Sequence, residues 1–196
     1  MESKKRKAVQ EMNPIDSMAT YLAKCIRKNN EHAGSEIALK YALSLTINTS
    51  LAIIFSLLIS VFTNRFDETL IGICVFLLIR YVSGGVHLSS SLACCITSIF
   101  IFTTIANVPS EYTEIFVYLN AISFIILLFT APNNIKDVSR VPQKFYPLLK
   151  IITLLIIFSN FFIKSTVFTA AFIIQAVLTT RYSYKIINYF ERRQPH

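Results

Sequence analysis

The residues best suited to chemistry lie in one short stretch of the chain, which runs from Arg80 to Cys95 and reads Arg-Tyr-Val-Ser-Gly-Gly-Val-His-Leu-Ser-Ser-Ser-Leu-Ala-Cys-Cys. It contains His87, the only histidine between residues 33 and 195, and two adjacent thiols, Cys94 and Cys95. A cysteine attacks a carbonyl carbon as its thiolate, and a neighbouring histidine can take the thiol proton. Polar groups at membrane depth usually serve a function, because they are costly to place in hydrocarbon. The stretch therefore indicates cysteine-based nucleophilic chemistry.

The spacing of His87 and Cys94 requires a break in the helix. On one continuous helix the two side chains share a face within about 20°, but they lie about 10 Å apart along the axis. Proton transfer needs a separation of about 3 Å. Gly84 and Gly85, two of the four glycines of the chain, can end a helix before His87 and let the ring fold back toward Cys94. Such irregular backbone is tolerated in a membrane protein where protein covers it or water reaches it.

Each of these residues also has a plainer interpretation. His87 alone can be a packed or interfacial histidine, and Cys94 alone can be a small core residue. Cys95 competes with Cys94 as the nucleophile. Arg80 either extends to the inner membrane interface or helps to bind substrate. A metal ion would use His87, Cys94 and Cys95, but no fourth ligand is visible in the sequence, so we expect neither a metal nor another cofactor.

Six apolar runs surround this stretch and predict an all-α integral membrane protein. A membrane-spanning helix needs about 20 predominantly apolar residues. We expect about six transmembrane helices, near residues 41–63, 66–82, 89–108, 114–131, 147–163 and 166–182. The connectors leave no room for a soluble domain, so residues 1–196 form a single membrane domain. Its parts are a cytoplasmic and interfacial segment at 1–40, a transmembrane bundle at 41–183 and a cytoplasmic tail at 184–196.

The N-terminal segment predicts an amphipathic helix that lies on the membrane surface. Asn13 and Pro14 provide a cap and a first-turn proline, and Gly34 can end the helix. At 100° per residue, one face is apolar and consists of Ile15, Met18, Leu22, Cys25 and Ile26. The opposite face is basic and consists of Lys24, Arg27 and Lys28. Such a helix suits the cytoplasmic leaflet, although an amphipathic helix that packs on a partner would show the same pattern.

The distribution of positive charge predicts the orientation of the chain. The chain has 19 lysines and arginines and a net charge of +8. With a cytoplasmic N-terminus and six spans, all of them except Arg65 and Lys164 fall on the cytoplasmic side. Loops on that side carry the excess of lysine and arginine in membrane proteins. We therefore expect a multi-pass protein of the cytoplasmic membrane with both termini inside. Its basic residues face anionic lipid headgroups, so the charge does not call for a nucleic-acid partner.

The motif Arg-x-x-Ser-Gly-Gly-x-His, followed by six residues and a cysteine, resembles the signature of the accessory gene regulator B (AgrB) family, the membrane peptidases of Gram-positive quorum sensing. In this chain the motif runs from Arg80 to Cys94. The chain length, the six apolar runs and the basic stretch that opens with Ala131-Pro132-Asn133 are similar to that family too. The pair Asn133-Asn134 departs from it, because many relatives have an acidic residue at this place.

The resemblance implies a definite reaction. A membrane-embedded cysteine endopeptidase of this family cleaves an AgrD-like propeptide on its C-terminal side and forms a thioester with the peptide. A cysteine or serine of the peptide then displaces the enzyme and closes a thiolactone or lactone ring, which gives an autoinducing peptide. The resemblance assigns His87 and Cys94 as the catalytic pair, prefers Cys94 over its neighbour, and gives Arg80, Gly84 and Gly85 supporting roles.

A basic loop predicted on the cytoplasmic side carries Lys136, Arg140 and Lys144. The loop either serves orientation alone or steers an acidic segment of the propeptide, which the resemblance implies. A second copy of the chain is a further candidate partner. The rival function is that of a small transporter or peptide exporter without protease activity. Against it, no predicted span carries paired ionisable groups, and no inverted repeat is evident.

Overall fold

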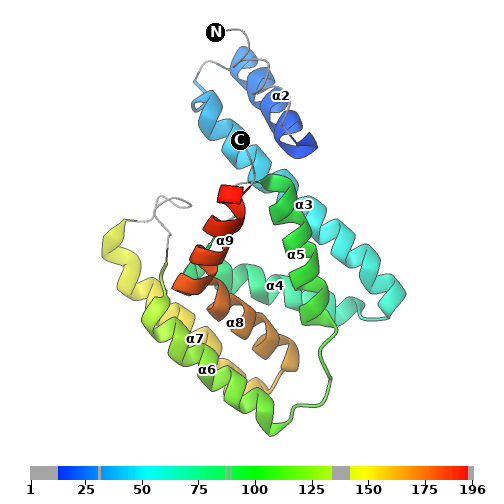
Figure 1. Cartoon of the computed structure of the whole chain (residues 1–196), viewed down its shortest axis with the longest axis vertical. Helices are drawn as coiled ribbons and strands as arrows, with labels where there is room; N and C mark the ends of the chain where they lie inside the picture. Colours follow the sequence, from blue (N-terminus) through cyan, green and yellow to red (C-terminus); the bar gives the residue numbers. More distant parts are fainter. Residues whose placement is uncertain (1–12, 31, 87, 89, 134–141, 194–196) are drawn as a thin grey trace. The chain divides into compact units, whose positions relative to one another are not determined.

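The structure, a computed structural model, describes residues 13–30, 32–86, 88, 90–133 and 142–193, with side chains up to residue 189. Within these residues every regular element is a helix (Figure 1). The α-helices are α2 (Pro14–Asn29), α3 (Glu36–Thr63), α4 (Phe66–Ser83), α5 (Ser91–Ala106), α6 (Glu114–Thr130), α7 (Tyr146–Ile163), α8 (Thr166–Leu178) and α9 (Arg181–Arg193). A short 3-10 helix, η2 (Gln143–Phe145), precedes α7. The all-α class is thereby confirmed for the described part of the chain.

The chain folds into two compact units. The first comprises residues 1–56 and 88–100, and it contains α2, most of α3 and the first part of α5. The second comprises residues 57–87 and 101–196, and it contains α4, α6, α7, α8 and α9 with the ends of α3 and α5. The stretch that carries the candidate chemistry therefore belongs partly to one unit and partly to the other.

The core of the second unit is built from four apolar helices. Helix α8 packs against α4 and α6, and α7 packs against α6 and α4; Figure 1 shows α6 and α7 running side by side. Small residues on α8 are buried, which allows the close approach of backbones that membrane helix pairs use. The buried cluster at the centre of the unit consists of Ile79, Leu127, Ala131, Ile157, Phe172 and Ala176.

Gly72 sets how closely α4 approaches its neighbours. A Cβ atom at this position would lie 2.7 Å from Cγ2 of Ile105 and 3.4 Å from Cγ1 of Val167. One turn further along α4, the ring of Phe76 packs edge-on against Phe102, with 5.8 Å between the ring centroids. The absence of a side chain at Gly72 thus permits the packing of α4 on the C-terminal part of α5 and on α8.

A buried amide network holds α6, α7 and α8 together. The side-chain amide of Asn160 donates to Oγ1 of Thr169 (2.8 Å) and to Oδ1 of Asn120 (3.3 Å), and its oxygen accepts from the backbone N–H of Ser165 (3.0 Å). The amide of Asn120 donates to the carbonyl of Ile157 at 3.3 Å. Polar groups in a core are tolerated when they are hydrogen-bonded in this way. The network fixes the turn between α7 and α8.

The six predicted apolar runs each coincide with a helix in the series from α3 to α8. Two helical segments, Glu36–Thr63 and Gln143–Ile163, are long and apolar enough to cross a membrane by length and composition. Helices α5, α6 and α8 are apolar but shorter, and α4 carries Asp67, Glu68 and Arg80. The expectation of about six transmembrane helices stays a prediction.

Helix α2 begins as predicted at Asn13 and Pro14. The side chain of Asn13 accepts a hydrogen bond from the backbone N–H of Asp16 (3.0 Å), and Pro14 occupies the first helical position. This is the usual role of an asparagine cap, which satisfies a donor that the helix leaves unpaired. The helix ends before Asn30, whose backbone is extended. It is therefore shorter than predicted, because the expected end was at Gly34. Its location at a membrane surface stays a prediction.

The sixth apolar helix is shorter than the predicted run of 166–182. Helix α8 stops where Thr179 and Thr180 turn their hydroxyl groups back onto the main chain, donating to the carbonyls of Ala176 and Val177, both at 2.7 Å. Threonine side chains that bond to nearby carbonyls compete with helix continuation. The apolar composition of the run gave no sign of this local competition.

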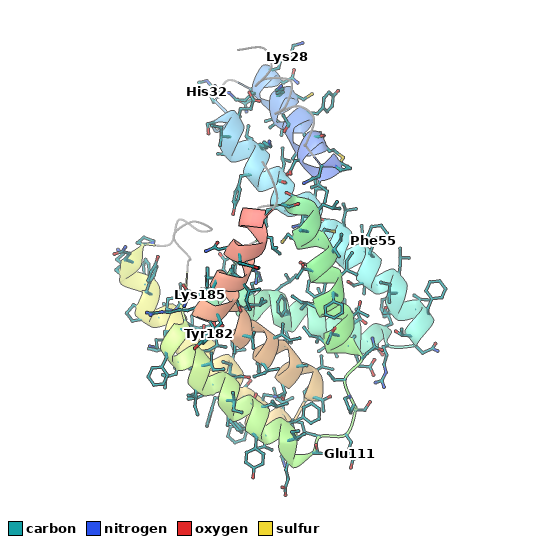
Figure 2. The ribbon with its side chains drawn as sticks, viewed as in Figure 1. Lys28, His32, Phe55, Glu111, Tyr182 and Lys185 are labelled. Atoms are coloured by element: carbon teal, nitrogen blue, oxygen red, sulfur yellow. The ribbon has the colours of Figure 1, made fainter. Side chains whose placement is uncertain are left out.

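Helix α9 follows this break and occupies most of the segment that was predicted as a cytoplasmic tail at 184–196. Its first turn is anchored to α8, because the hydroxyl of Ser183 donates to the carbonyl of Val177 at 2.6 Å. Tyr182 and Lys185 extend from α9 and are exposed, as Figure 2 shows. The end of the chain is therefore helical as far as residue 193.

Candidate active site

Two glycines end α4 and begin the loop that leads to residue 87. Gly84 has φ 72° and ψ −147°, and Gly85 has φ 130°. Both conformations are accessible to glycine and strained for residues with a side chain. The described residues 84–86, 88 and 90 are not helical, and α5 begins only at Ser91. The structure thus has the helix break that the spacing of the candidate catalytic residues requires.

Arg80 folds back onto this loop from the last turn of α4. One of its terminal nitrogens donates to the carbonyl of Val86 at 2.7 Å. The backbone N–H of Val86 in turn donates to the carbonyl of Leu178, at the end of α8 (3.3 Å). Arg80 therefore helps to fix the backbone immediately before residue 87, and its supporting role in catalysis stays a prediction.

Asn133, in the segment after α6, pairs with the loop. Its backbone N–H donates to the carbonyl of Ser83 (2.9 Å), and its carbonyl accepts from the N–H of Gly85 (3.0 Å). These two bonds form an isolated parallel bridge between Gly84 and Asn133. The side-chain amide of Asn133 donates to the carbonyl of Thr179 at 2.8 Å. The segment after α6 is thus tied both to the loop and to the end of α8.

Gln175 reaches the same loop from α8. Its side-chain nitrogen donates to the hydroxyl of Ser83 at 2.8 Å and to the carbonyl of Gly84. The hydroxyl of Ser83 in turn donates to the carbonyl of Ile79 at 2.7 Å. Residues 83–86 are therefore held by hydrogen bonds from three places: the end of α4, the segment after α6, and α8.

Cys94 lies in the first unit, on the first turn of α5, and its backbone N–H donates to the carbonyl of Ser90 (3.0 Å). Cys94 is half-buried, whereas Cys95 is 5% exposed. Both are free thiols, as are Cys25 and Cys74. Among the described residues, no three histidine, cysteine, aspartate or glutamate side chains come together as metal ligands.

A cluster of polar side chains around the carboxylate of Asp16 includes Ser91 at the start of α5 in the first unit. The hydroxyls of Ser44 on α3 and Ser91 on α5 donate to the same oxygen of Asp16, at 2.7 Å and 2.6 Å. The other carboxylate oxygen accepts from the amide of Asn13 at 2.7 Å. Since Ser91 precedes Cys94 by one helical turn, Asp16 links the N-terminal helix directly to the part of α5 that carries the candidate nucleophile.

The structure brings some of the predicted site residues together, and others lie outside the described residues. Arg80, Gly84 and Gly85 come together in the loop of the second unit. His87 lies outside the described residues, as do Lys136 and Arg140 of the basic loop. Lys144 is described; it is exposed in η2, and its ammonium lies 5.1 Å from the centre of the Phe145 ring. The catalytic and substrate-binding assignments stay predictions.

Two side chains of the site were missed by the sequence analysis. Gln175 is a single amide within the apolar run of α8, and a polar residue in such a run is the signal that could have identified it. Asp16 is an acid in the first turn of α2. Acids are common there because they interact favourably with the helix dipole, so its position did not indicate a further role. The sequence analysis gave Asn133 both as part of a stretch similar to the resembled family and as a departure from it, and predicted no contact with the loop for it.

The fold and the loop define the class of the protein. The described residues form an all-helical fold with two helical segments that are long and apolar enough to cross a membrane, and a hydrogen-bonded loop follows α4. The model of one family, accessory gene regulator B, matches residues 15–184. The chain belongs to the accessory gene regulator B family, and the resemblance seen in the sequence is confirmed.

Relatives in Staphylococcus aureus are similar to part of the chain. Accessory gene regulator protein B of strain bovine RF122 / ET3-1 is 34% identical over 116 residues, and those of strains JH9 and N315 are 33% identical over the same length. Each match covers 59% of this chain and 60% of the relative. The chain thus matches about three fifths of the length of these relatives. No solved structure matches it. These relatives connect the chain to the accessory gene regulator system.

Proposed function

We propose that the chain is a membrane-embedded cysteine endopeptidase that cleaves an AgrD-like propeptide and promotes its cyclisation into a quorum-sensing peptide. The observation that carries the proposal is the glycine break at residues 84 and 85, which is held by hydrogen bonds directly before His87. A histidine seven residues before a cysteine on one helix could not reach it. The break removes that obstacle, and family membership supports the roles of His87 and Cys94.

The proposed reaction is acyl transfer. His87 takes the proton of the Cys94 thiol, and the thiolate attacks the scissile carbonyl carbon. The peptide C–N bond breaks, His87 returns the proton to the leaving amine, and the N-terminal part of the propeptide remains bound to Cys94 as a thioester. A thiol or hydroxyl of the peptide then attacks the thioester carbonyl, closes the ring and releases the Cys94 sulfur, which regains a proton. Exclusion of water favours this outcome over hydrolysis.

Burial supports Cys94 over Cys95 as the nucleophile. A nucleophilic thiol must be reached by the substrate, and Cys94 is half-buried while Cys95 is 5% exposed. Buried thiols in apolar surroundings are inert, because burial disfavours the thiolate. The structural environments therefore agree with the preference that the sequence motif gives to Cys94.

The surroundings of the site are part of the proposal. The protein is a multi-pass protein of the cytoplasmic membrane, with about six spans, an interfacial N-terminal helix and both termini inside. Its basic cytoplasmic residues face anionic lipid headgroups. The loop with Lys136, Arg140 and Lys144 either steers an acidic propeptide segment or serves orientation alone. A second copy of the chain, bound in a homodimer, is a further proposed partner.

Cleavage by cysteine variants tests the function. The chain is reconstituted in lipid vesicles with a synthetic AgrD-like propeptide, and release of the C-terminal fragment is measured. We expect Cys94→Ala to abolish release and His87→Ala to do nearly the same, with no further loss in the double variant, because the two residues act as one unit. Cys95→Ala is the matched control and should keep most of the activity.

Full activity in Cys94→Ala would refute the assignment of the nucleophile. If Cys95→Ala were inactive and Cys94→Ala were active, the reaction would survive with the other thiol. Transport of the intact propeptide across the vesicle membrane without cleavage would instead favour the exporter.

A further inference from the structure

The side chain of Gln175 is the least expected polar group in the second unit. It is fully buried in α8, where it is the one amide side chain of a mostly apolar helix. Its nitrogen donates two hydrogen bonds to the loop, one to the hydroxyl of Ser83 and one to the carbonyl of Gly84. Its oxygen Oε1 is buried and has no hydrogen-bond partner among the described residues. Both hydrogens of the Gln175 amide are therefore donated to the loop, while its single acceptor oxygen has no partner among the described residues.

The Gln175 amide has opposing effects on stability, because its nitrogen makes two buried hydrogen bonds while its oxygen makes none with the described residues. Leaving a buried carbonyl oxygen without a partner is unfavourable. Groups that cost stability without an evident structural gain concentrate at functional sites. What Gln175 does gain is control over the backbone of Ser83 and Gly84, the residues where α4 ends.

Gln175 and Arg80 hold this loop through their side chains, and Gln175 does so from α8. The bonds between Asn133 and residues 83 and 85, and the bond from Val86 to Leu178, join backbone to backbone. Gly85 lies next to this amide, since a Cβ atom there would lie 3.4 Å from Nε2 of Gln175. Within α8, Gln175 is thus the residue whose substitution alters the loop while the backbone bridges remain available.

We propose that Gln175 is a positioning residue for the cysteine peptidase reaction, an inference that rests on the proposed function. Its amide fixes the backbone of Ser83 and Gly84, and thereby the direction in which the chain enters residue 87, the proposed general base. Gln175 does not touch the substrate. It acts on turnover by holding the backbone directly before the general base, because small displacements of a catalytic group reduce rates strongly.

Gln175→Met tests the proposal, because methionine keeps the approximate length and removes both donors. Asn120→Leu is the matched control: it removes another fully buried amide of the same unit, which bonds to Ile157 and not to the loop. Both variants and the unchanged chain are reconstituted in lipid nanodiscs. The first turnover of an AgrD-like propeptide, its apparent KM and the folded fraction are measured for each.

We expect Gln175→Met to reduce the rate of cleavage per folded molecule about tenfold or more with little change in KM, which is the signature of lost positioning. Asn120→Leu should lower thermal stability without changing the rate per folded molecule. Gln175→Asn, which keeps the amide on a side chain one methylene shorter, should fold and show an intermediate rate. This second variant decides the matter if Gln175→Met does not fold.

An unchanged rate per folded molecule in the Gln175 variants would overturn the proposal, and so would a rate loss of equal size in Asn120→Leu. Cys94→Ala separates this failure from failure of the function. If Cys94→Ala is inactive and the Gln175 variants are fully active, only the positioning role is refuted. If Cys94→Ala cleaves normally, the proposed function falls and the positioning role falls with it.

Discussion

Gly84 and Gly85 are neighbours with different tasks. Gly84 ends α4, where its positive φ turns the chain out of the helix, and Gly85 lets the loop lie against α8. A Cβ atom on Gly85 would be close to Gln175, Leu178 and Thr179, and its φ of 130° disfavours any residue with a side chain. The requirement for glycine at residue 85 therefore comes mainly from backbone conformation and only secondarily from space.

Replacement of Gly85 should affect activity more than stability. We expect Gly85→Ala to cost about 1–3 kcal/mol of stability, the usual cost of a strained backbone conformation. The backbone can relieve that strain by moving residues 85 and 86, so propeptide cleavage should fall at least about tenfold. Thermal unfolding and cleavage assays on the same preparation measure the two effects. Gly34→Ala is the control, because no atom lies within 4 Å of a Cβ there; wild-type cleavage by Gly85→Ala would contradict this account.

At the scale of helices, Asp16 connects three elements of the first unit. Its carboxylate accepts hydroxyl hydrogen bonds from Ser44 on α3 and from Ser91 on α5, while it also belongs to the first turn of α2. Hydrogen bonds to a charged acceptor are stronger than those between neutral groups. The N-terminal helix is therefore held against the start of the helix that bears Cys94.

Removal of this carboxylate should loosen α2. We expect Asp16→Ala to weaken the docking of α2 by roughly 1–3 kcal/mol, since two hydroxyl groups lose a charged acceptor. The backbone amides of α2 should then exchange with deuterium faster, while those of α6 and α7 keep their rates. Glu36→Ala, at an exposed acid in the first turn of α3, serves as the control. Equal exchange in Asp16→Ala and the unchanged chain would show that the cluster does not hold the helix.

Most helices could be predicted from the sequence, because the signals for them are local. Long apolar runs, the Asn13–Pro14 cap and the Gly84–Gly85 break depend on residues near one another in the chain, and each has its counterpart in the structure. The end of α8 could not be predicted, because Thr179 bonds to its own helix within an apolar context where composition suggests continuation. Local competition of this kind is invisible to hydropathy.

The candidate site was predicted only in part for a related reason. The motif identifies Arg80 and the glycines, which lie close together in sequence. The ties from Asn133 and Gln175 depend on contacts between residues far apart in the chain, such as the 92 positions that separate Gln175 from Ser83. A sequence pattern within one segment carries no information about such distant partners. They are identified only from the packing of the folded chain.

The charge of the whole molecule supports one orientation and can be tested directly. Single cysteines are introduced at Asn13, Ser110 and Lys136 in a chain whose native cysteines are replaced by serine. With both termini inside, an impermeant thiol reagent added to intact cells should label the cysteine at residue 110 and not those at 13 and 136. Labelling at all three after lysis is the control. Labelling at residue 136 from outside would contradict the six-span arrangement.

The proposed chemistry requires residues from both compact units, because Cys94 belongs to the first and the loop that leads into residue 87 to the second. The experiment therefore uses the intact chain and not one of its units. A propeptide that lacks the nucleophile for ring closure cannot displace the enzyme, so the acyl-enzyme should accumulate. It can then be located within the chain by mass spectrometry of proteolytic fragments.

The most direct measurement is the identity of the residue that carries the peptide after the reaction of the reconstituted chain with this ring-deficient propeptide. Our account predicts the N-terminal fragment of the propeptide attached to Cys94 through a thioester, released by hydroxylamine and absent from the His87→Ala variant. Cleavage that proceeds with no adduct on Cys94, or with the adduct on Cys95, would contradict the assignment of Cys94 as the nucleophile.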